Sequence, residues 1–239
     1  MLCPVTPQAA SKLVLFDIDA TLLSTGGAGM RAMARAGKEL FGEKLSWDGI
    51  EPSGGLDPLL FQEAAERSGL SVRPEDHDAF RELYEVLLKD ELERGKSGVR
   101  ALPGVHEVLS ILRGQRNVVL GLLTGNYAQT ARWKLRAADI EKVWFSIGAF
   151  GADAGSRPGL VEIALHRYAK QFGEPIRPGR VVVVGDTPRD MSSACLNGCT
   201  AFGVATGKYS VEDLKTAGAH VAVENLLNPD PLLRLLEDG

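Results

Sequence analysis

The sequence predicts an α/β protein with a mostly parallel sheet and helices on both of its faces. After residue 101, short apolar runs alternate with amphipathic helical segments, which is typical of parallel sheets. The runs at 12–16, 117–123 and 180–184 are continuous, as expected for strands that are buried on both faces. The stretch at 30–98 holds helical patterns only, so we expect a helical insertion after the first strand.

The first strand, at 12–16, ends in two carboxylates. Asp17 and Asp19 are separated by one residue, so both side chains leave the same face of an extended chain. Two carboxylates about 6–7 Å apart repel each other, and each loses hydration beside a buried strand. We therefore expect a cation next to them, or a reaction that needs both. A flexible glycine-rich exit follows at 24–29.

Three helices are predicted within the insertion. Ala32, Ala36 and Leu40 fall on one helical face. Asp57 is predicted to cap the N-terminus of the second helix, with Pro58 in its first position. The third helix carries the clearest amphipathic stripe of the chain, formed by Phe80, Leu83, Tyr84, Leu87, Leu88 and Leu92. We interpret this stripe as the core of a helix bundle.

Helices and strands alternate through the rest of the chain. We expect helices at 103–112, 127–137, 160–172 and 211–217, a helix that ends near 197, and a last helix from 231. We expect the remaining strands at 117–123, 143–147, 180–184, 200–204 and 220–223.

The composition is that of an ordinary globular protein. Of the 239 residues, 44 % are hydrophobic and 24 % are charged, and the formal net charge of −4 argues against nucleic acid as a partner. No apolar run has the length of a membrane span, and the first residues do not resemble a signal peptide. We therefore expect no membrane partner.

The cysteine content favours a reducing compartment. The chain contains three cysteines, and an odd number argues against a disulfide framework. We therefore expect a cytoplasmic protein. Cys195 and Cys199 lack the further ligands that a structural zinc site needs, so we interpret them as small buried apolar residues.

Polar side chains follow three of the predicted strands. They are Asp17, Asp19 and Thr21 after the first strand, Thr124 and Asn126 after the second, and Asp186 and Asp190 after the fourth. The carboxyl ends of parallel strands meet at one edge of a sheet, where ligands bind. Taken singly, Thr124 could cap the next helix and Asp190 could be a first-turn acid. Capping does not explain why all three strands end in this way.

This set of residues suits phosphoryl transfer through an aspartate. Three acids at one edge form an all-oxygen site for a hard divalent cation such as Mg²⁺. One aspartate can attack phosphorus and form an acyl phosphate, and a second can protonate the leaving oxygen. The hydroxyl of Thr124 can hold a phosphoryl oxygen. A positive side chain is also expected between the second and fourth strands, where it would balance the negative charge.

The order and spacing of these residues resemble those of the haloacid dehalogenase-like hydrolase superfamily, in its phosphoglycolate phosphatase and β-phosphoglucomutase-like branch. Its first motif, D-x-D-x-T, matches 17–21, its second matches Thr124, and its fourth, G-D-x-x-x-D, matches 185–190. The resemblance implies a Rossmann-like core at residues 1–23 and 101–239. It also implies an α-helical cap at 24–100, inserted between the first and second motifs.

The resemblance also implies a role for each acid. Asp17 would be the nucleophile and a ligand of Mg²⁺. Asp19 would be the general acid and base, with its backbone carbonyl on the metal. Asp186 would be a carboxylate ligand, and Asp190 would support the metal site directly or through water. Thr124, with the neighbouring Gly125 and Asn126, would bind the phosphoryl group.

Two positions depart from the family pattern. The residue after the second aspartate is usually glycine but is Ala20 here, which demands ordinary backbone angles or a little strain. The third motif usually holds Lys-Pro, and its match is Arg157-Pro158, in a loop before the helix at 160–172. Arginine keeps the positive charge and adds bidentate donors, so Arg157 is a candidate for catalysis and phosphate binding. A solvated loop arginine is the alternative.

The predicted function is a Mg²⁺-dependent phosphatase that hydrolyses a small phosphorylated metabolite through an aspartyl-phosphate intermediate. Asp19 favours this chemistry over dehalogenation, which needs no acid for an alcohol leaving group. A sugar phosphomutase and a catalytically idle binding protein on the same scaffold are the alternatives, and phosphonatase chemistry would need a Schiff-base lysine from the cap. The loop at 53–57 is either the selector of the substrate or a plain connection between helices.

Overall fold

A parallel sheet forms the centre of the protein in a computed structural model, which describes residues 12–94 and 98–237. Its strands lie in the order β5-β4-β1-β6-β7-β8. They are β1 (Lys12–Phe16), β4 (Val118–Leu123), β5 (Ile147–Ala149), β6 (Val181–Gly185), β7 (Thr200–Val204) and β8 (Val221–Val223). The predicted α/β fold with a parallel sheet is therefore confirmed. Residues 1–11 and 238–239 of the predicted core and 95–97 of the predicted cap lie outside the described residues.

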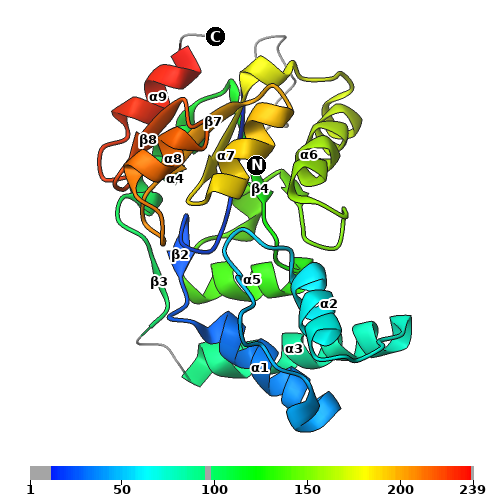
Figure 1. Cartoon of the computed structure of the whole chain (residues 1–239). Coiled ribbons are helices and arrows are strands. Elements are labelled where there is room, and N and C mark those ends of the chain that lie inside the picture. Colours follow the sequence, from blue (N-terminus) through cyan, green and yellow to red (C-terminus); the bar gives the residue numbers. More distant parts are fainter. Residues whose placement is uncertain (1–11, 95–97, 238–239) are drawn as a thin grey trace.

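Helices cover both faces of the sheet (Figure 1). One face packs against α4 (Val105–Gly114), α5 (Ala128–Ala137) and α9 (Asp230–Glu237). The other packs against α6 (Arg157–Phe172), α7 (Pro188–Leu196) and α8 (Val211–Thr216). Strand β1 lies in the middle, and its alternate residues supply the two cores: Val14 and Phe16 one, Leu13 and Leu15 the other. This double burial explains why the strand is apolar throughout.

The inserted segment forms three helices with a core of their own. They are α1 (Ala28–Phe41), α2 (Asp57–Arg67) and α3 (Pro74–Arg94). The rings of Phe61 and Phe80 stack with centroids 4.0 Å apart, and Tyr84 continues the row. Tyr127, just before α5, belongs to the same core, so the three helices sit against α5 below the sheet (Figure 1). The interpretation of the apolar stripe as a bundle core is confirmed.

Two very short strands connect this helical segment with the sheet. β2 (Leu23–Ser24) pairs antiparallel with β3 (Arg100–Ala101). The backbone N–H of Leu102 also donates to the carbonyl of Leu22 at 3.0 Å. The segment that enters the helical insertion and the segment that leaves it are therefore hydrogen-bonded to each other. The sequence pattern predicted only a flexible exit at this place.

The strand predicted at 143–147 is misplaced, because it shares only Ile147 with the observed strand β5. Residues Lys142–Trp144 form a 3₁₀ turn, and β5 begins at Ile147. Phe145 turns into the core beside Phe16, whereas the side chain of Val143 is 81 % exposed. Two further 3₁₀ turns occur at Gly42–Lys44 and Pro178–Arg180.

The cysteines differ from expectation in one respect. Cys199 is buried, as expected, but Cys195 is exposed on α7, and neither forms a disulfide. None of the described helices combines the length and apolar character that crossing a membrane requires.

Gly104, just before α4, packs closely against the backbone of Leu226, so a substitution there can test this contact. Gly104 has φ +82°, and a Cβ there would lie 2.0 Å from the carbonyl oxygen of Leu226. Gly173, after α6, has φ +86°, but a Cβ on this residue would meet no atom within 4 Å. We expect Gly104→Ala to lower the free energy of unfolding by about 2–4 kcal/mol, because left-handed strain and overpacking add. Gly173→Ala serves as the control, with an expected loss of about 1–2 kcal/mol from strain alone. Equal losses in urea unfolding would contradict this packing.

Candidate active site

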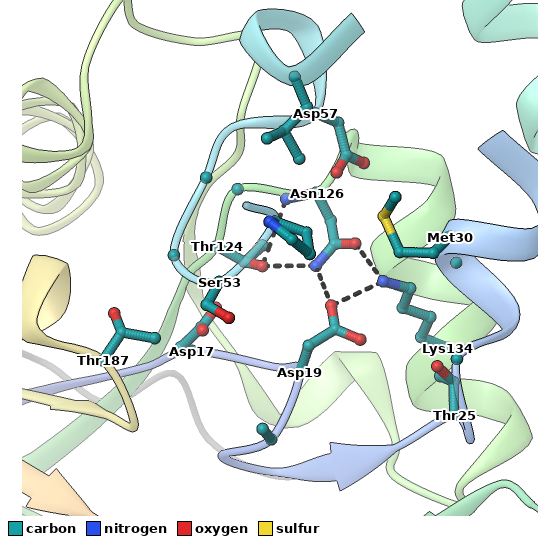
Figure 2. A pocket seen from close by; sticks show the side chains of 18 of the residues that line it. Asp17, Asp19, Thr25, Met30, Ser53, Asp57, Thr124, Asn126, Lys134 and Thr187 are labelled. Atoms are coloured by element: carbon teal, nitrogen blue, oxygen red, sulfur yellow. Dashed lines mark hydrogen bonds and ion pairs between the residues drawn. The ribbon is translucent and has the colours of Figure 1, made fainter. Parts of the chain in front are cut away.

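The predicted site residues gather at the carboxyl edge of the sheet, around a cavity of about 280 Å³. Those that line it are Asp17, Asp19, Thr124, Gly125, Asn126, Arg157 and Asp186. Asp190 lies behind them, fully buried on α7. Residues of the inserted helical segment form the opposite wall of the cavity. Figure 2 shows four of the sequence-predicted residues, Asp17, Asp19, Thr124 and Asn126, around this space.

Three buried carboxylates form one side of the site. Asp17, Asp186 and Asp190 each offer an oxygen within 4.8 Å of the others. Burial, together with repulsion from Asp190 and Asp17, raises the pKa of Asp186 to about 8. Burial likewise raises the pKa of Asp17. Carboxylates gathered in this way require a compensating cation, and their oxygen donors suit a hard divalent ion.

Arg157 supplies part of that compensation. Its Nη2 lies 3.1 Å from Asp17 Oδ2 and 2.5 Å from Asp190 Oδ1, and its side chain is 5 % exposed. It is the first residue of α6, which Ser156 caps by accepting the N–H of Gly159. Arg157 was expected in a loop before the helix, but the helix begins at Arg157 itself, so that expectation is wrong. A solvated loop arginine is contradicted by the burial of Arg157.

Asp190 holds this arginine and caps a helix as well. Its Oδ1 accepts a hydrogen bond from Arg157 Nε at 2.7 Å. Its Oδ2 accepts from the backbone N–H and the hydroxyl of Thr187, which completes a capping box at the start of α7. Both oxygens of Asp190 are thus engaged by protein donors. Asp190 is therefore a first-turn acid of α7, one of the interpretations weighed for it, and it also lies beside Asp17 and Asp186.

A second polar cluster surrounds Asp19, and it contains a residue that the sequence analysis missed. Lys134 Nζ lies 2.6 Å from Asp19 Oδ2 and 2.5 Å from Asn126 Oδ1. Asn126 Nδ2 donates to the same Asp19 oxygen at 2.8 Å and to Thr124 Oγ1 at 2.7 Å (Figure 2). Lys134 belongs to the buried face of α5 with Ala131 and Leu135. A lysine on an apolar helical face was the sign that could have revealed it.

Asp57 is also part of the site, although it was predicted as a helix cap. That prediction is wrong, because Leu56 precedes α2 as its cap and Asp57 is the first helical residue. Its carboxylate accepts the backbone N–H of Tyr127 at 3.1 Å, and its own N–H donates to the carbonyl of Gly125 at 2.8 Å. Burial raises the pKa of Asp57 to about 7. This tertiary contact takes the carboxylate away from its own helix.

The loop before Asp57 docks closely on the core. A Cβ on Gly125 would lie 1.8 Å from the carbonyl oxygen of Gly55, so only glycine permits this approach. Arg189 Nη1 donates to the carbonyl of Ser53, and Lys208 forms an ion pair with Glu51. The loop at 53–57 is therefore more than a connection between helices: it contacts the segment that follows β4.

Ala20 adopts a left-handed backbone conformation, with φ +56°. Its N–H donates to the carbonyl of Leu23 at 2.8 Å, and its own carbonyl accepts the hydroxyl of Thr206 at 2.5 Å. Of the two backbone conformations weighed for this position, the structure has the strained one. The cost is about 1–2 kcal/mol for a residue with a Cβ.

The wall formed by the helical segment carries little charge. Its lining residues are Ser24, Thr25, Gly26, Gly27, Gly29, Met30, Met33, Pro52, Ser53, Gly54, Gly55, Asp57, Leu60 and Tyr84. The hydroxyl of Tyr84 makes no hydrogen bond with any described residue, and burial keeps its pKa well above the usual value. The two cations among the described lining residues, Arg157 and Lys134, are both paired with carboxylates.

Comparisons with known proteins bear on the family and the fold. Residues 11–195 match a family model described as haloacid dehalogenase-like hydrolase. A hydrolase from Pseudomonas syringae is 23% identical with a TM-score of 0.71, over 94% of this chain and 98% of that one. A predicted phosphoglycolate phosphatase from Haemophilus somnus is 18% identical with a TM-score of 0.67, over 95% and 99%. A β-phosphoglucomutase from Clostridium difficile is 16% identical with a TM-score of 0.70, over 95% and 98%. These structures share the fold; no curated protein matches the chain.

The raised pKa of Asp57 predicts a pH dependence of stability. A carboxyl that binds its proton more tightly when folded stabilises the protein fully below the unfolded pKa of 3.8, and this contribution is lost as the pH rises through about 7. Asp57→Asn cannot titrate. Relative to wild type, it should therefore gain about 1–3 kcal/mol of unfolding free energy between pH 5 and pH 8.

Urea unfolding at the two pH values measures this difference. Asp48→Asn, a change at an exposed carboxylate, is the control and should alter stability equally at both. A constant difference between Asp57→Asn and wild type would contradict the prediction.

Proposed function

Because the chain belongs to the haloacid dehalogenase-like hydrolase family, we propose that it is a Mg²⁺-dependent phosphatase that hydrolyses a small phosphate monoester. The observation that carries the proposal is that two aspartates with different surroundings line one cavity. Asp17 lies with the other buried acids, whereas Asp19 accepts hydrogen bonds from donors of its own. The two carboxylates lie on the same wall but have different partners. Such a separation suits a nucleophile and a general acid.

In the first half of the reaction, an oxygen of Asp17 attacks phosphorus and the bond from phosphorus to the ester oxygen breaks. The proton of the Asp19 carboxyl passes to that oxygen, so the product leaves as a neutral alcohol. Asp17 now carries the phosphoryl group. Arg157, held by Asp190, orients Asp17 for the attack and lowers the repulsion from the phosphate.

In the second half, water attacks the phosphoryl group and gives its proton to Asp19. The bond between phosphorus and Asp17 breaks, inorganic phosphate is released, and both carboxyl groups return to their initial states. In this proposal Thr124 donates its hydroxyl hydrogen to a phosphoryl oxygen, and the hydrogen bond that its oxygen accepts from Asn126 supports this role. Gly125 and Asn126 complete the wall beside it.

The metal would be held by the carboxylates of Asp17 and Asp186. The donor set fits, since the cluster is buried, anionic and composed of oxygen atoms. The backbone carbonyl of Asp19 is a further ligand in this proposal, and Asp190 acts through Arg157 and the start of α7, because its own oxygens are engaged. When bound, Mg²⁺ neutralises charge between the nucleophile and the phosphate.

We assign residues 24–100 as a cap on a core formed by 1–23 and 101–239. In support, α1–α3 have their own core, and their residues close the cavity opposite Asp17. A cap of this kind excludes water from the reacting groups. The three cysteines favour a cytoplasmic location.

The charges around the cavity favour hydrolysis of a monoester over phosphomutase activity. A mutase must bind an intermediate with a second phosphate, which needs cations on the far wall. Among the described lining residues that wall has one ionisable acid, Asp57, and no lysine or arginine. Lys134 and Arg157 are already paired. The proposed substrate is therefore a phosphate ester of an uncharged alcohol.

The first test is hydrolysis of p-nitrophenyl phosphate with Mg²⁺. We expect turnover that EDTA abolishes, and a loss of at least about 10³-fold in Asp17→Asn, because the amide cannot attack phosphorus. Released p-nitrophenol measures the rate. Turnover that persists without metal, or full activity in Asp17→Asn, would refute the mechanism, and binding without turnover would indicate an idle scaffold.

A matched pair of substrates tests the charge of the leaving group. We expect kcat/KM for 2-hydroxyethyl phosphate to exceed that for phosphoglycolate by about 10-fold or more, because a carboxylate would face Asp57 without a free cation. Phosphate release measures both. Equal or better hydrolysis of phosphoglycolate would contradict this assignment, as would phosphate exchange between sugar positions that outpaces hydrolysis.

A further inference from the structure

We propose that Lys134 is the residue that positions Asp19 for proton transfer, an inference that rests on the proposed phosphatase function. Lys134 lies on α5 and is only 4 % exposed. Its ammonium group reaches the cavity and contacts Asp19 Oδ2 and Asn126 Oδ1 (Figure 2). A buried lysine at this place needs a reason, because an ammonium group loses hydration there.

The geometry shows why Asp19 needs such a partner. Asp19 lies beyond the end of β1, and its side chain is 42 % exposed, whereas Asp17 is buried. An acid this exposed is not held by packing. Lys134 and Asn126 both donate to Oδ2 of Asp19, which fixes the carboxyl group and leaves Oδ1 without a protein donor among the described residues. That oxygen can exchange a proton with the leaving group.

Lys134 also fixes the orientation of Asn126. Since an ammonium group only donates, the amide oxygen of Asn126 must face Lys134 and the amide nitrogen must face Asp19 and Thr124. The oxygen of Thr124 then accepts a hydrogen bond, and its own hydrogen is free for a phosphoryl oxygen. The buried ammonium group of Lys134 thus sets the direction of the hydrogen bonds that Asn126 donates to Asp19 and to Thr124.

The test compares two leaving groups. p-Nitrophenolate departs without protonation, whereas the alkoxide from 2-hydroxyethyl phosphate needs a proton from Asp19. We expect Lys134→Met to lower kcat/KM at least about 30-fold for the alkyl ester and less than about 3-fold for p-nitrophenyl phosphate. Asp19→Asn should show the same selectivity with larger losses. Because kcat/KM covers steps up to departure of the alcohol, slow hydrolysis of the phosphoenzyme does not affect it.

Matched variants separate positioning from structure. Arg132→Met, a change on the exposed face of the same helix, should leave both rates unchanged. Lys134→Gln keeps a donor without the charge and should lose less activity on the alkyl ester than Lys134→Met, and circular dichroism checks the fold of each variant. Equal losses on both substrates, or unfolding of both Lys134 variants, would overturn the proposal. Absence of metal-dependent hydrolysis in the wild type would instead refute the proposed function, whatever the variants do.

Discussion

The gathering of carboxylates at the end of β1 is the constraint on which the rest of the site depends. Three of them, Asp17, Asp186 and Asp190, lie together in the interior, and burial raises the pKa of Asp17 and of Asp186. Arg157 stabilises the cluster by contacting two of its members. These ion pairs connect the start of α6 with the end of β1 and with α7. They therefore offset the repulsion among the acids and also hold the two helices beside the strand.

The site is organised as two electrostatic units that share one strand end. On one side, Asp17 belongs to the buried acids and Arg157. On the other, Asp19 belongs to Lys134 and Asn126. Each aspartate thus has a positive partner of its own. This arrangement lets two neighbouring carboxylates serve different steps of one reaction, and it leaves little positive charge for any further anionic group of a substrate.

The features that local pattern determines were predictable from the sequence. Strand β1 and its acids follow from a continuous apolar run and a spacing of two, and the six-stranded sheet follows from the alternation of elements. The features that distant contacts determine were missed. β2 and β3 are two residues each and pair across the whole helical segment. The N-cap rule misplaced Asp57 because the carboxylate prefers the N–H of Tyr127. The contact between Lys134 and Asp19 exists only because α5 packs beside the end of β1, and no local pattern predicts that packing.

The left-handed Ala20 has a consequence in the unfolded state. Glycine, the usual residue at this position in the family, would adopt φ +56° without strain, but it would also have more conformations to lose on folding. Alanine restricts the unfolded chain by about 0.4–1 kcal/mol, which offsets only part of its strain of about 1–2 kcal/mol in the native state. The alanine therefore acts on the unfolded chain as well as on the folded one, and the folded protein keeps a net cost in stability of up to about 1.5 kcal/mol between Asp19 and Thr21.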